Sequence, residues 1–427
     1  MKIGDTFTCL IASQKHGVVV RLIASGGEAD LLEVTLGGVA MALKLFYSIG
    51  STPEREKHCR WLIDKGAPHP AFVYPIDLVR TTDGRLGIVM PLIPGSFHEA
   101  ASVHAIPDAA RPSQRNAVKA CLNIALAFHT AIRAGLIYID ASAAQMMVDV
   151  AGAVKIVDVT NIVDQVTPSL NLRTFGYTAP ELWLGKTLPS VATGRYSLGV
   201  VFFDLLCGGH PLFGRRLPRI LGPEDEHEAL HFSPRFIFDP HDDSNRPDPV
   251  EHAAPLVYWP ILPQKIRNLF TRHFTAGLRA PNRRVIEIEW IDAFYDAYTA
   301  CFPCPCGAEV FHDPSAAELV CWNCGSRLSR PARLKFAGGR ETVLSNGELV
   351  TRYDVTGRQS YDFTPVGRVV CHALSRGSIE LENLSSVAWT WRRRSGAGGT
   401  VVPGKRAPLY RDVVISFAPG STATVAE

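Results

Sequence analysis

The sequence of 427 residues contains no apolar run of the roughly 18 residues that a membrane-spanning helix needs. Its first residues lack the basic start, apolar middle and small-residue cleavage site of a signal peptide. Its formal net charge of +3 is too small to attract a nucleic acid through bulk charge. We therefore expect a cytoplasmic protein that binds neither membranes nor nucleic acids.

The low-complexity composition of disordered chains is also lacking. Aromatic residues make up 9% of the sequence and are spread along its whole length, and hydrophobic residues make up 46%. At roughly 100–200 residues per domain, the length predicts two to four domains with a sizeable core.

Cysteine is present, but its arrangement is not that of a disulfide framework. Five of the ten cysteines are scattered, and five fall within residues 301–324. A small secreted domain spreads its cysteines, whereas a tight cluster in a long chain is more typical of a metal site.

The first part of the chain is predicted to be rich in β-strands. Residues 17–46 read as strand-forming runs, and Gly26-Gly27 and Gly37-Gly38 predict turns between them. Thr52-Pro53-Glu54 combines a cap residue, a proline at the first helical position and an acid, which predicts a helix start. Further strands are expected at residues 72–80 and 86–92.

The middle of the chain is predicted to be helical, because apolar residues recur there at three- and four-residue intervals. Residues 98–113 and 214–254 are rich in Pro, Ala or Asp and are expected to be a connection and a long loop. After the cysteine cluster, residues 334–423 alternate apolar and polar in short runs, which predicts an all-β module. Helices are expected at residues 116–133, 196–207, 263–276 and 285–298, and a hairpin at 147–157.

Several charged or amide residues stand at the ends of these predicted elements. Lys44 ends a strand, and Asp140 follows the first long helix of the middle segment. Gln145 comes five residues after Asp140, and Asp158 ends a short strand. One such residue alone is more often a solvated surface charge, so the ordered set carries the argument. Further along stand Ala179-Pro180-Glu181 and Arg283.

In this order and spacing, the residues resemble the protein kinase signature: a strand lysine, a catalytic-loop Asp with a metal-binding amide, a second metal-binding Asp, and Ala-Pro-Glu. The resemblance covers about residues 15–298. It implies an α+β, bilobal kinase-like fold with a hinge near Met90–Pro94. We expect an N-lobe at 1–94, a C-lobe at 95–299, a zinc-binding knuckle at 300–333 and an all-β domain at 334–427.

The resemblance implies ATP-dependent phosphoryl transfer to Ser/Thr hydroxyls of proteins, with Mg²⁺ or Mn²⁺. Lys44 would hold the α- and β-phosphates, and Asp140 would take the proton of the acceptor hydroxyl. Asp158, assisted by Gln145, would bind the metal ion. The other implied nucleotide contacts are Gly26, Gly27, Glu56, Met90 and Leu92.

Two ion pairs are expected from the same resemblance. The helix acid that pairs with Lys44 is best matched by Glu56 and next by Glu54, although both also suit a first helical turn through the helix dipole. Glu181 and Arg283 are expected to form a buried structural pair in the large lobe.

Departures from the kinase pattern keep a second function open. The glycine loop reads Ser25-Gly26-Gly27-Glu28-Ala29-Asp30, which predicts that Asp30 faces the phosphates. Gln145 replaces the usual Asn and is one methylene longer, and Ser142 and Gly194 replace a Lys and an Asp. The alternative is therefore a pseudokinase, a nucleotide- or partner-binding scaffold; a small-molecule phosphotransferase is a third interpretation.

The cysteine cluster contains Cys304-Pro-Cys306-Gly and Cys321-Trp-Asn-Cys324-Gly. Two thiolate pairs, each followed by glycine in a tight knuckle, suit a structural, tetrahedral zinc ion. The first pair is ambiguous, because Cys301 and Cys304 have the other common spacing; the glycine after Cys306 favours Cys304 and Cys306. His312 is an alternative ligand, and free core thiols are the alternative to a metal site.

The C-terminal module resembles a degenerate forkhead-associated (FHA) β-sandwich, weakly, through Gly367-Arg368 and the run from Ile379 to Ser385. Phosphothreonine recognition would need a paired Arg and Ser, for which Arg368 and Ser385 are the candidates. A kinase, a zinc knuckle and an FHA-like domain together are similar to the kinase of phosphatase–kinase triads associated with tellurium resistance. By this analogy, partners would be a protein substrate, a cognate phosphatase and a phosphoprotein ligand of the C-terminal domain.

Overall fold

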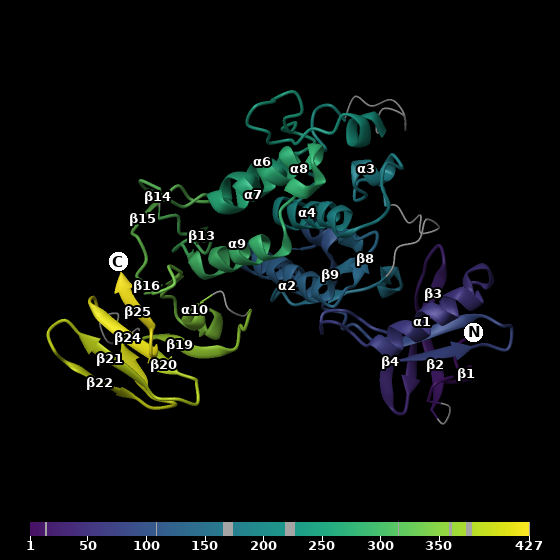
Figure 1. The fold of residues 1–427 in the computed structure, drawn as a ribbon, viewed down its shortest axis with the longest axis horizontal. Coiled ribbons are helices and arrows are strands. Elements are labelled where there is room, and N and C mark those ends of the chain that lie inside the picture. Colours follow the sequence, from purple (N-terminus) through teal and green to yellow (C-terminus); the bar gives the residue numbers. More distant parts are fainter. Residues whose placement is uncertain are drawn as a thin grey trace. The chain divides into compact units, whose positions relative to one another are not determined.

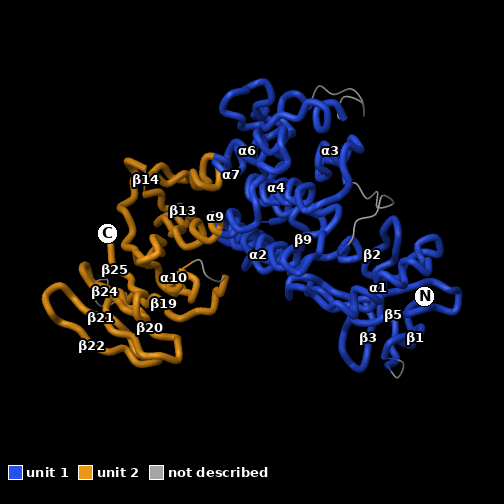
Figure 2. Tube along the Cα trace, viewed as in Figure 1, with its two compact units in different colours: residues 1–259, 268–291 blue, residues 260–267, 292–427 orange. Residues whose placement is uncertain are grey.

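The computed structural model describes residues 1–12, 15–107, 109–164, 174–217, 227–314, 316–357, 361–372 and 378–426. Contacts divide the chain into two compact units (Figure 2): unit 1 comprises residues 1–259 and 268–291, and unit 2 comprises residues 260–267 and 292–427. The finer four-domain division stays a prediction. Among the described helices, none has the length and apolar character to cross a membrane.

Unit 1 begins with a six-stranded antiparallel sheet, of which β1 to β4 are labelled in Figure 1. Its strands run in the order β1-β2-β3-β4-β6-β5. Helix α1 (Pro53–Lys65) is inserted between β4 and β5, and Thr52 caps it as predicted, by accepting a hydrogen bond from the Arg55 backbone N–H. Two apolar clusters of the unit draw on the buried residues of this sheet. The strands are β1 (Thr6–Thr8), β2 (His16–Ser25), β3 (Ala29–Leu36), β4 (Val39–Phe46), β5 (Asp77–Arg80) and β6 (Leu86–Pro91).

The strand predicted at 72–80 is wrong in its first half, because only Asp77–Arg80 joins the sheet. Phe72 instead forms an isolated parallel bridge with Ile156, and the Val73 N–H donates to the Ile156 carbonyl. These hydrogen bonds hold the segment before β5 against a strand of the helical part of the unit.

The rest of unit 1 is mainly helical, as predicted. Helix α2 (Gln114–Arg133) packs against α4 (Val191–Cys207), which is buried around most of its circumference because it is apolar on nearly all sides. The other helices that lie wholly or partly in unit 1 are α3 (Pro180–Trp183), α6 (Ala253–Tyr258), α7 (Gln264–Phe274), α8 (Ala276–Arg279) and α9 (Glu287–Ala300). Short strands are β7 (His98–Glu99), β8 (Ile137–Tyr138), β9 (Met146–Val148), β10 (Val154–Ile156) and β11 (Ile162–Val163). Short 3-10 helices are η1 (Ser48–Gly50), η2 (Ala100–Ala105), η3 (Ala143–Gln145), η4 (Val159–Asn161), η6 (Trp259–Ile261) and η7 (Pro281–Arg283), and η5 (Glu228–Phe232) is a short π-helix.

Unit 2 contains two small hairpins and a β-sandwich-like region, which confirms the all-β prediction for the C-terminal module. Its two sheets run β17-β16-β25-β24-β21-β22 and β18-β19-β20-β23, and buried residues from both form one core around Trp389. The hairpins are β12 (Cys301–Pro303) with β13 (Glu309–Phe311), and β14 (Leu319–Val320) with β15 (Arg327–Leu328). The remaining elements are β16 (Arg333–Phe336), β17 (Glu341–Val343), β18 (Leu349–Thr351), α10 (Arg352–Thr356), β19 (Pro365–Cys371), β20 (Ile379–Asn383), β21 (Trp389–Arg393), β22 (Gly398–Val401), β23 (Arg406–Pro408), β24 (Val413–Ala418) and β25 (Ser421–Ala426).

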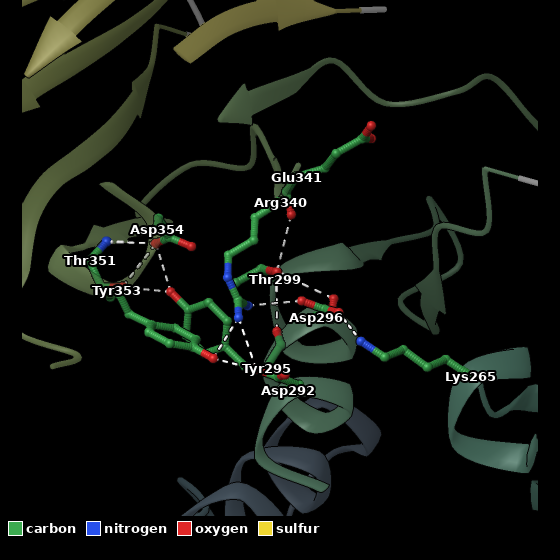
Figure 3. A network of polar contacts seen from close by, with 10 residues as sticks. All are labelled: Lys265, Asp292, Tyr295, Asp296, Thr299, Arg340, Glu341, Thr351, Tyr353 and Asp354. Carbon is green, nitrogen blue, oxygen red and sulfur yellow. Dashed lines mark hydrogen bonds and ion pairs between the residues drawn. The ribbon is translucent and has the colours of Figure 1, made fainter. Parts of the chain in front are cut away.

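A buried polar network attaches the second half of α9 to the sandwich within unit 2 (Figure 3). The Arg340 guanidinium, from the β16–β17 turn, donates to Asp292 and Asp296 at 3.0 Å each and lies over the Tyr353 ring at 3.9 Å. The Tyr295 hydroxyl donates to Asp354 Oδ2 at 2.6 Å. Charged and aromatic contacts of this kind fix the helix orientation more specifically than apolar packing alone.

Candidate functional site

Lys44 and Asp158, 114 residues apart, meet in unit 1. Lys44 Nζ donates to Asp158 Oδ1 at 2.8 Å and also to Glu28 Oε1 at 2.7 Å. Burial alone would lower the pKa of Lys44, but Asp158 and then Glu28 more than offset it, and the pKa is raised. The lysine therefore stays charged and is held between two carboxylates.

The backbone at the two predicted aspartates adopts a left-handed conformation, with φ of 66° at Asp140 and 58° at Asp158. Among the non-glycine residues that the structure describes, only Asp412 shares a positive φ. Such conformations are unfavourable for residues with a Cβ and concentrate at functional sites, which makes these two positions candidates on backbone geometry alone.

Two hydrogen-bond donors beside Asp158 were not predicted from the sequence. Thr160 Oγ1 donates to Oδ1 at 3.0 Å, and Asn161 Nδ2 approaches Oδ2 at 3.4 Å. Both belong to the turn η4, which Asp158 itself begins. Their position, two and three residues after the acid, is the only signal that could have identified them.

Asp140 has a different environment. The Thr174 backbone N–H donates to Oδ1 at 2.6 Å and its hydroxyl to Oδ2 at 2.8 Å. Burial raises the pKa of Asp140 although the Thr174 hydrogen bonds oppose it, and the Asp158 charge adds to the rise. A carboxylate with a raised pKa is better suited to accept a proton near neutral pH.

The predicted metal ligand Gln145 uses its side chain within its own loop. Its Oε1 accepts from the Ser142 backbone N–H at 2.9 Å, which closes a capping box around η3. Among the described residues, no group of three or more His, Cys, Asp or Glu side chains that could hold a metal ion includes Asp158. The carboxylate of Asp158 would suit Mg²⁺ or Mn²⁺, but the structure does not present the Gln145 oxygen as a second ligand.

The predicted helix partner of Lys44 is placed elsewhere. Glu56 accepts hydrogen bonds from Arg80 and Arg60, which lower its pKa. The contact expected of it is made by Glu28, from the turn between β2 and β3. Asp30, expected at the phosphates, accepts instead from Ser25 Oγ at 2.8 Å and Tyr47 Oη at 3.1 Å.

The other predicted nucleotide contacts lie close to this site. Met90 and the partly buried Leu92 belong to one apolar cluster with Ala42 and Val157, the neighbour of Asp158. Gly26 and Gly27 lie in the β2–β3 turn, and neither has a positive φ. A Cβ added at Gly27 would meet no atom within 4 Å, so the conformation itself does not require glycine there.

The buried ion pair of Glu181 is made with Arg284, and the prediction of Arg283 is wrong by one residue. The Arg284 guanidinium donates to both Glu181 oxygens at 2.7 and 2.8 Å and to the Ala192 carbonyl at 2.9 Å. Arg283 ends the turn η7, and the chain leaves that turn with the next side chain directed inward.

A second site lies in unit 2, where Cys304, Cys306, Cys321 and Cys324 place their Sγ atoms within 4.8 Å of one another. Two of the Sγ–Sγ distances are 3.7 Å (304 to 324) and 3.6 Å (306 to 321). The described residues include all ten cysteines, and no two of them form a disulfide. The four predicted ligands are thus brought together, and Cys301 lies outside the group.

Each cysteine pair sits on a glycine knuckle. Gly307 (φ 90°) donates its N–H to the Cys304 carbonyl at 2.8 Å, and Gly325 (φ 71°) donates to the Cys321 carbonyl at 2.9 Å. Hydrogen bonds from Ser326, first its hydroxyl and then its backbone, lower the pKa of Cys324 to about 6. Two such thiol pairs can hold a metal ion such as zinc.

Arg368 and Ser385, the candidates for phosphothreonine recognition, are both engaged with other groups. Arg368 donates to Glu382 at 2.8 Å, and the Ser385 hydroxyl donates to Asn383 Oδ1 at 2.7 Å. Their partners lie on or next to β20, so the structure does not present them as a pair for phosphate.

Comparisons with known proteins add no relative: no protein-family model matches the chain, and no curated protein matches its sequence.

Proposed function

We propose that the chain is a divergent ATP-dependent phosphotransferase of the protein kinase-like superfamily, acting on Ser/Thr hydroxyls of proteins. The contact between Lys44 and Asp158, with Asp140 near enough for the two acidic charges to interact, carries the proposal. An antiparallel sheet with one helix inserted after the lysine strand, followed by a helical part, supports a bilobal kinase-like fold.

In this proposal each residue has one task. Lys44 binds the phosphate chain, and Asp158 offers its carboxylate to the metal ion. Mg²⁺ or Mn²⁺, when bound, supplies charge neutralisation for the transferred phosphoryl group. The acceptor hydroxyl takes the place of the Thr174 hydroxyl at Asp140 Oδ2, and Asp140 accepts its proton.

A pseudokinase is the second candidate, and the position of Gln145 favours it. Its Oε1 is used by the Ser142 N–H, which leaves one carboxylate where kinases provide two metal ligands. A scaffold that binds a nucleotide or a protein partner would tolerate this loss. A cognate phosphatase and a phosphoprotein ligand stay expectations from the resemblance.

We also propose that the four clustered cysteines hold a structural zinc ion. Four protein thiolates leave no open coordination position for catalysis. The ion would hold two short hairpins together next to the sandwich.

Autophosphorylation with ATP, measured separately with Mg²⁺ and with Mn²⁺, tests the transfer activity. Asp140→Asn should lower the rate about 100-fold, because it removes the proton acceptor while keeping the hydrogen-bonding shape. Asp64→Asn, on the exposed face of α1, is the matched control. Thermal stabilisation by ATP without phosphate incorporation would favour the pseudokinase. No stabilisation at millimolar ATP would contradict both the phosphotransferase and a nucleotide-binding pseudokinase, and would leave only a partner-binding scaffold.

A further inference from the structure

The Glu28 carboxylate bridges two cations at the candidate site. Its Oε1 accepts from Lys44 Nζ at 2.7 Å, and its Oε2 accepts from Arg55 Nη1 at 3.1 Å. Both cations also lie over the Phe46 ring, at 5.4 Å for Lys44 and 4.5 Å for Arg55. Arg55 thus stands on α1 facing Glu28, and the helix acid expected nearby, Glu56, pairs elsewhere.

The backbone around Glu28 is fixed, while its carboxylate faces solvent. The Tyr47 N–H donates to the Glu28 carbonyl at 2.9 Å, and the Tyr47 hydroxyl donates to the Gly26 carbonyl at 3.0 Å. The Glu28 side chain is nevertheless 48% exposed, compared with 17% for Lys44. A rotation of this side chain would free both cations without moving the sheet.

We propose that Lys44 and Arg55 form a two-cation phosphate site that Glu28 closes in the ligand-free chain. A phosphate group resembles the carboxylate it replaces, because it also offers neighbouring oxygens to an ammonium and a guanidinium. With Glu28 in place, the two positive charges of Lys44 and Arg55 are balanced by the two negative charges of Glu28 and Asp158. Once Glu28 turns away, the site gains one positive charge toward an anionic ligand.

The ligand class is therefore a polyphosphate chain, and within the proposed function it is the phosphate part of ATP. This inference rests on the proposed nucleotide site, with which it shares Lys44, and adds Arg55 and Glu28 to it. It assigns Arg55 as a phosphate-binding residue and Glu28 as a competing internal anion. It also predicts that the effect of Glu28 depends on the number of phosphates in the ligand.

Calorimetric titration of the full chain with sodium tripolyphosphate, MgATP and adenosine tests the proposal. Glu28→Gln should bind tripolyphosphate and MgATP about fivefold more tightly, as expected for loss of a partly exposed ion pair, and should leave adenosine unchanged. Arg55→Gln should weaken both anionic ligands about fivefold and should reduce the gain from Glu28→Gln when the two are combined. Glu33→Gln is the matched control, because Glu33 lies on β3 and pairs with Arg21.

The outcomes separate the two proposals. Unchanged or weaker tripolyphosphate binding by Glu28→Gln overturns the inference, and MgATP binding by the wild type would leave the nucleotide proposal standing. If Glu28→Gln binds tripolyphosphate more tightly but neither it nor the wild type binds MgATP, the cation pair is supported and the nucleotide proposal is overturned. If no variant binds either anion, both proposals are overturned.

Discussion

The cysteine site gives the sharpest test, because Cys301 offers a natural control for Cys306. Four thiolates at about 2.3 Å from a central zinc ion lie about 3.8 Å apart along each edge of the tetrahedron. Two Sγ–Sγ distances in the structure, 3.7 Å and 3.6 Å, are close to that value. The change from Cys306 to Ser replaces one of these thiolates by a poor zinc ligand.

The expected effect is large, because little else holds this segment together. Its apolar cluster is small and consists of the buried residues Cys304, Val310 and Cys321 with three partly buried neighbours. Cys301, Phe311 and Leu319 are also buried in this segment. Its strands are two or three residues long. Zinc binding contributes about 10–16 kcal/mol in small zinc modules, so most of the order of these hairpins should depend on the metal.

Metal analysis of the purified chain should find about one zinc per wild-type molecule and about none in Cys306→Ser. Cys301→Ser should retain about one zinc, because the Cys301 thiol lies outside the cluster. Zinc retained by Cys306→Ser would refute the ligand assignment, and zinc lost from Cys301→Ser alone would show that Cys301 takes the place of Cys306. Equal loss from both would indicate that unfolding, and not ligation, controls zinc content.

Three further predictions concern unit 1 and the sandwich. Burial raises the pKa of Asp204 to about 6, although a 3.0 Å hydrogen bond from Tyr177 Oη opposes the rise. The folded chain therefore favours the neutral carboxyl, and ionisation of this carboxyl as the pH rises through 6 lowers the free energy of unfolding. In urea unfolding, the free energy of unfolding of Asp204→Asn should be about 2–3 kcal/mol higher than that of the wild type at pH 8 and equal to it at pH 4. A variant less stable than the wild type at pH 8 would contradict this. Arg340→Met should cost about 1–3 kcal/mol, because the partly buried Asp292 loses its cationic partner and keeps the Tyr353 hydroxyl, while Asp296 keeps Lys265. Calorimetry should show a smaller loss for Arg340→Lys, and equal losses would contradict a pairing role. Gln145→Asn should raise Mg²⁺-dependent phosphate incorporation about tenfold by returning the amide oxygen toward the metal, and an unchanged rate would show that Gln145 is not limiting.

Features set by local chemistry could be predicted from the sequence. The periodicity of residues 116–133 predicts α2, and the apolar run at 196–207 predicts the buried part of α4. The glycines after Cys306 and Cys324 predict the two knuckles, because each must adopt a positive φ that other residues avoid. In each case the signal lies within one turn or one helix.

Features set by long-range register could not be predicted in the same way. Leu31 pairs with Lys44 across β3 and β4, so Asp30 points to the opposite face of the sheet from the lysine. The acid that reaches Lys44 is Glu28, in the adjoining turn. Counting back from this register would have excluded Asp30, but the register itself depends on the folded sheet.

The choice of Arg284 over Arg283 has a similar origin. The two residues are adjacent and chemically identical, and no pattern of residue types distinguishes them. Only the conformation of the turn η7 decides which guanidinium enters the interior. Once inside, Arg284 needs its two bonds to Glu181 and one to a carbonyl, since an unpaired buried charge is strongly unfavourable.

The left-handed aspartates connect backbone strain with charge at the candidate site. A non-glycine residue in this conformation costs about 1–2 kcal/mol, so two of them in neighbouring loops require strong local contacts. Those contacts are made to the carboxylates: Thr174 holds Asp140 through two hydrogen bonds, and Lys44 and Thr160 hold Asp158. A ligand that displaces Thr174 or Lys44 from these oxygens therefore also releases the constraint on the strained backbone. Ligand binding and loop conformation should therefore be coupled at this site. Substitution of either aspartate by Asn removes the negative charge but keeps a residue that tolerates the left-handed region, so it separates the effect of the charge from that of the backbone conformation.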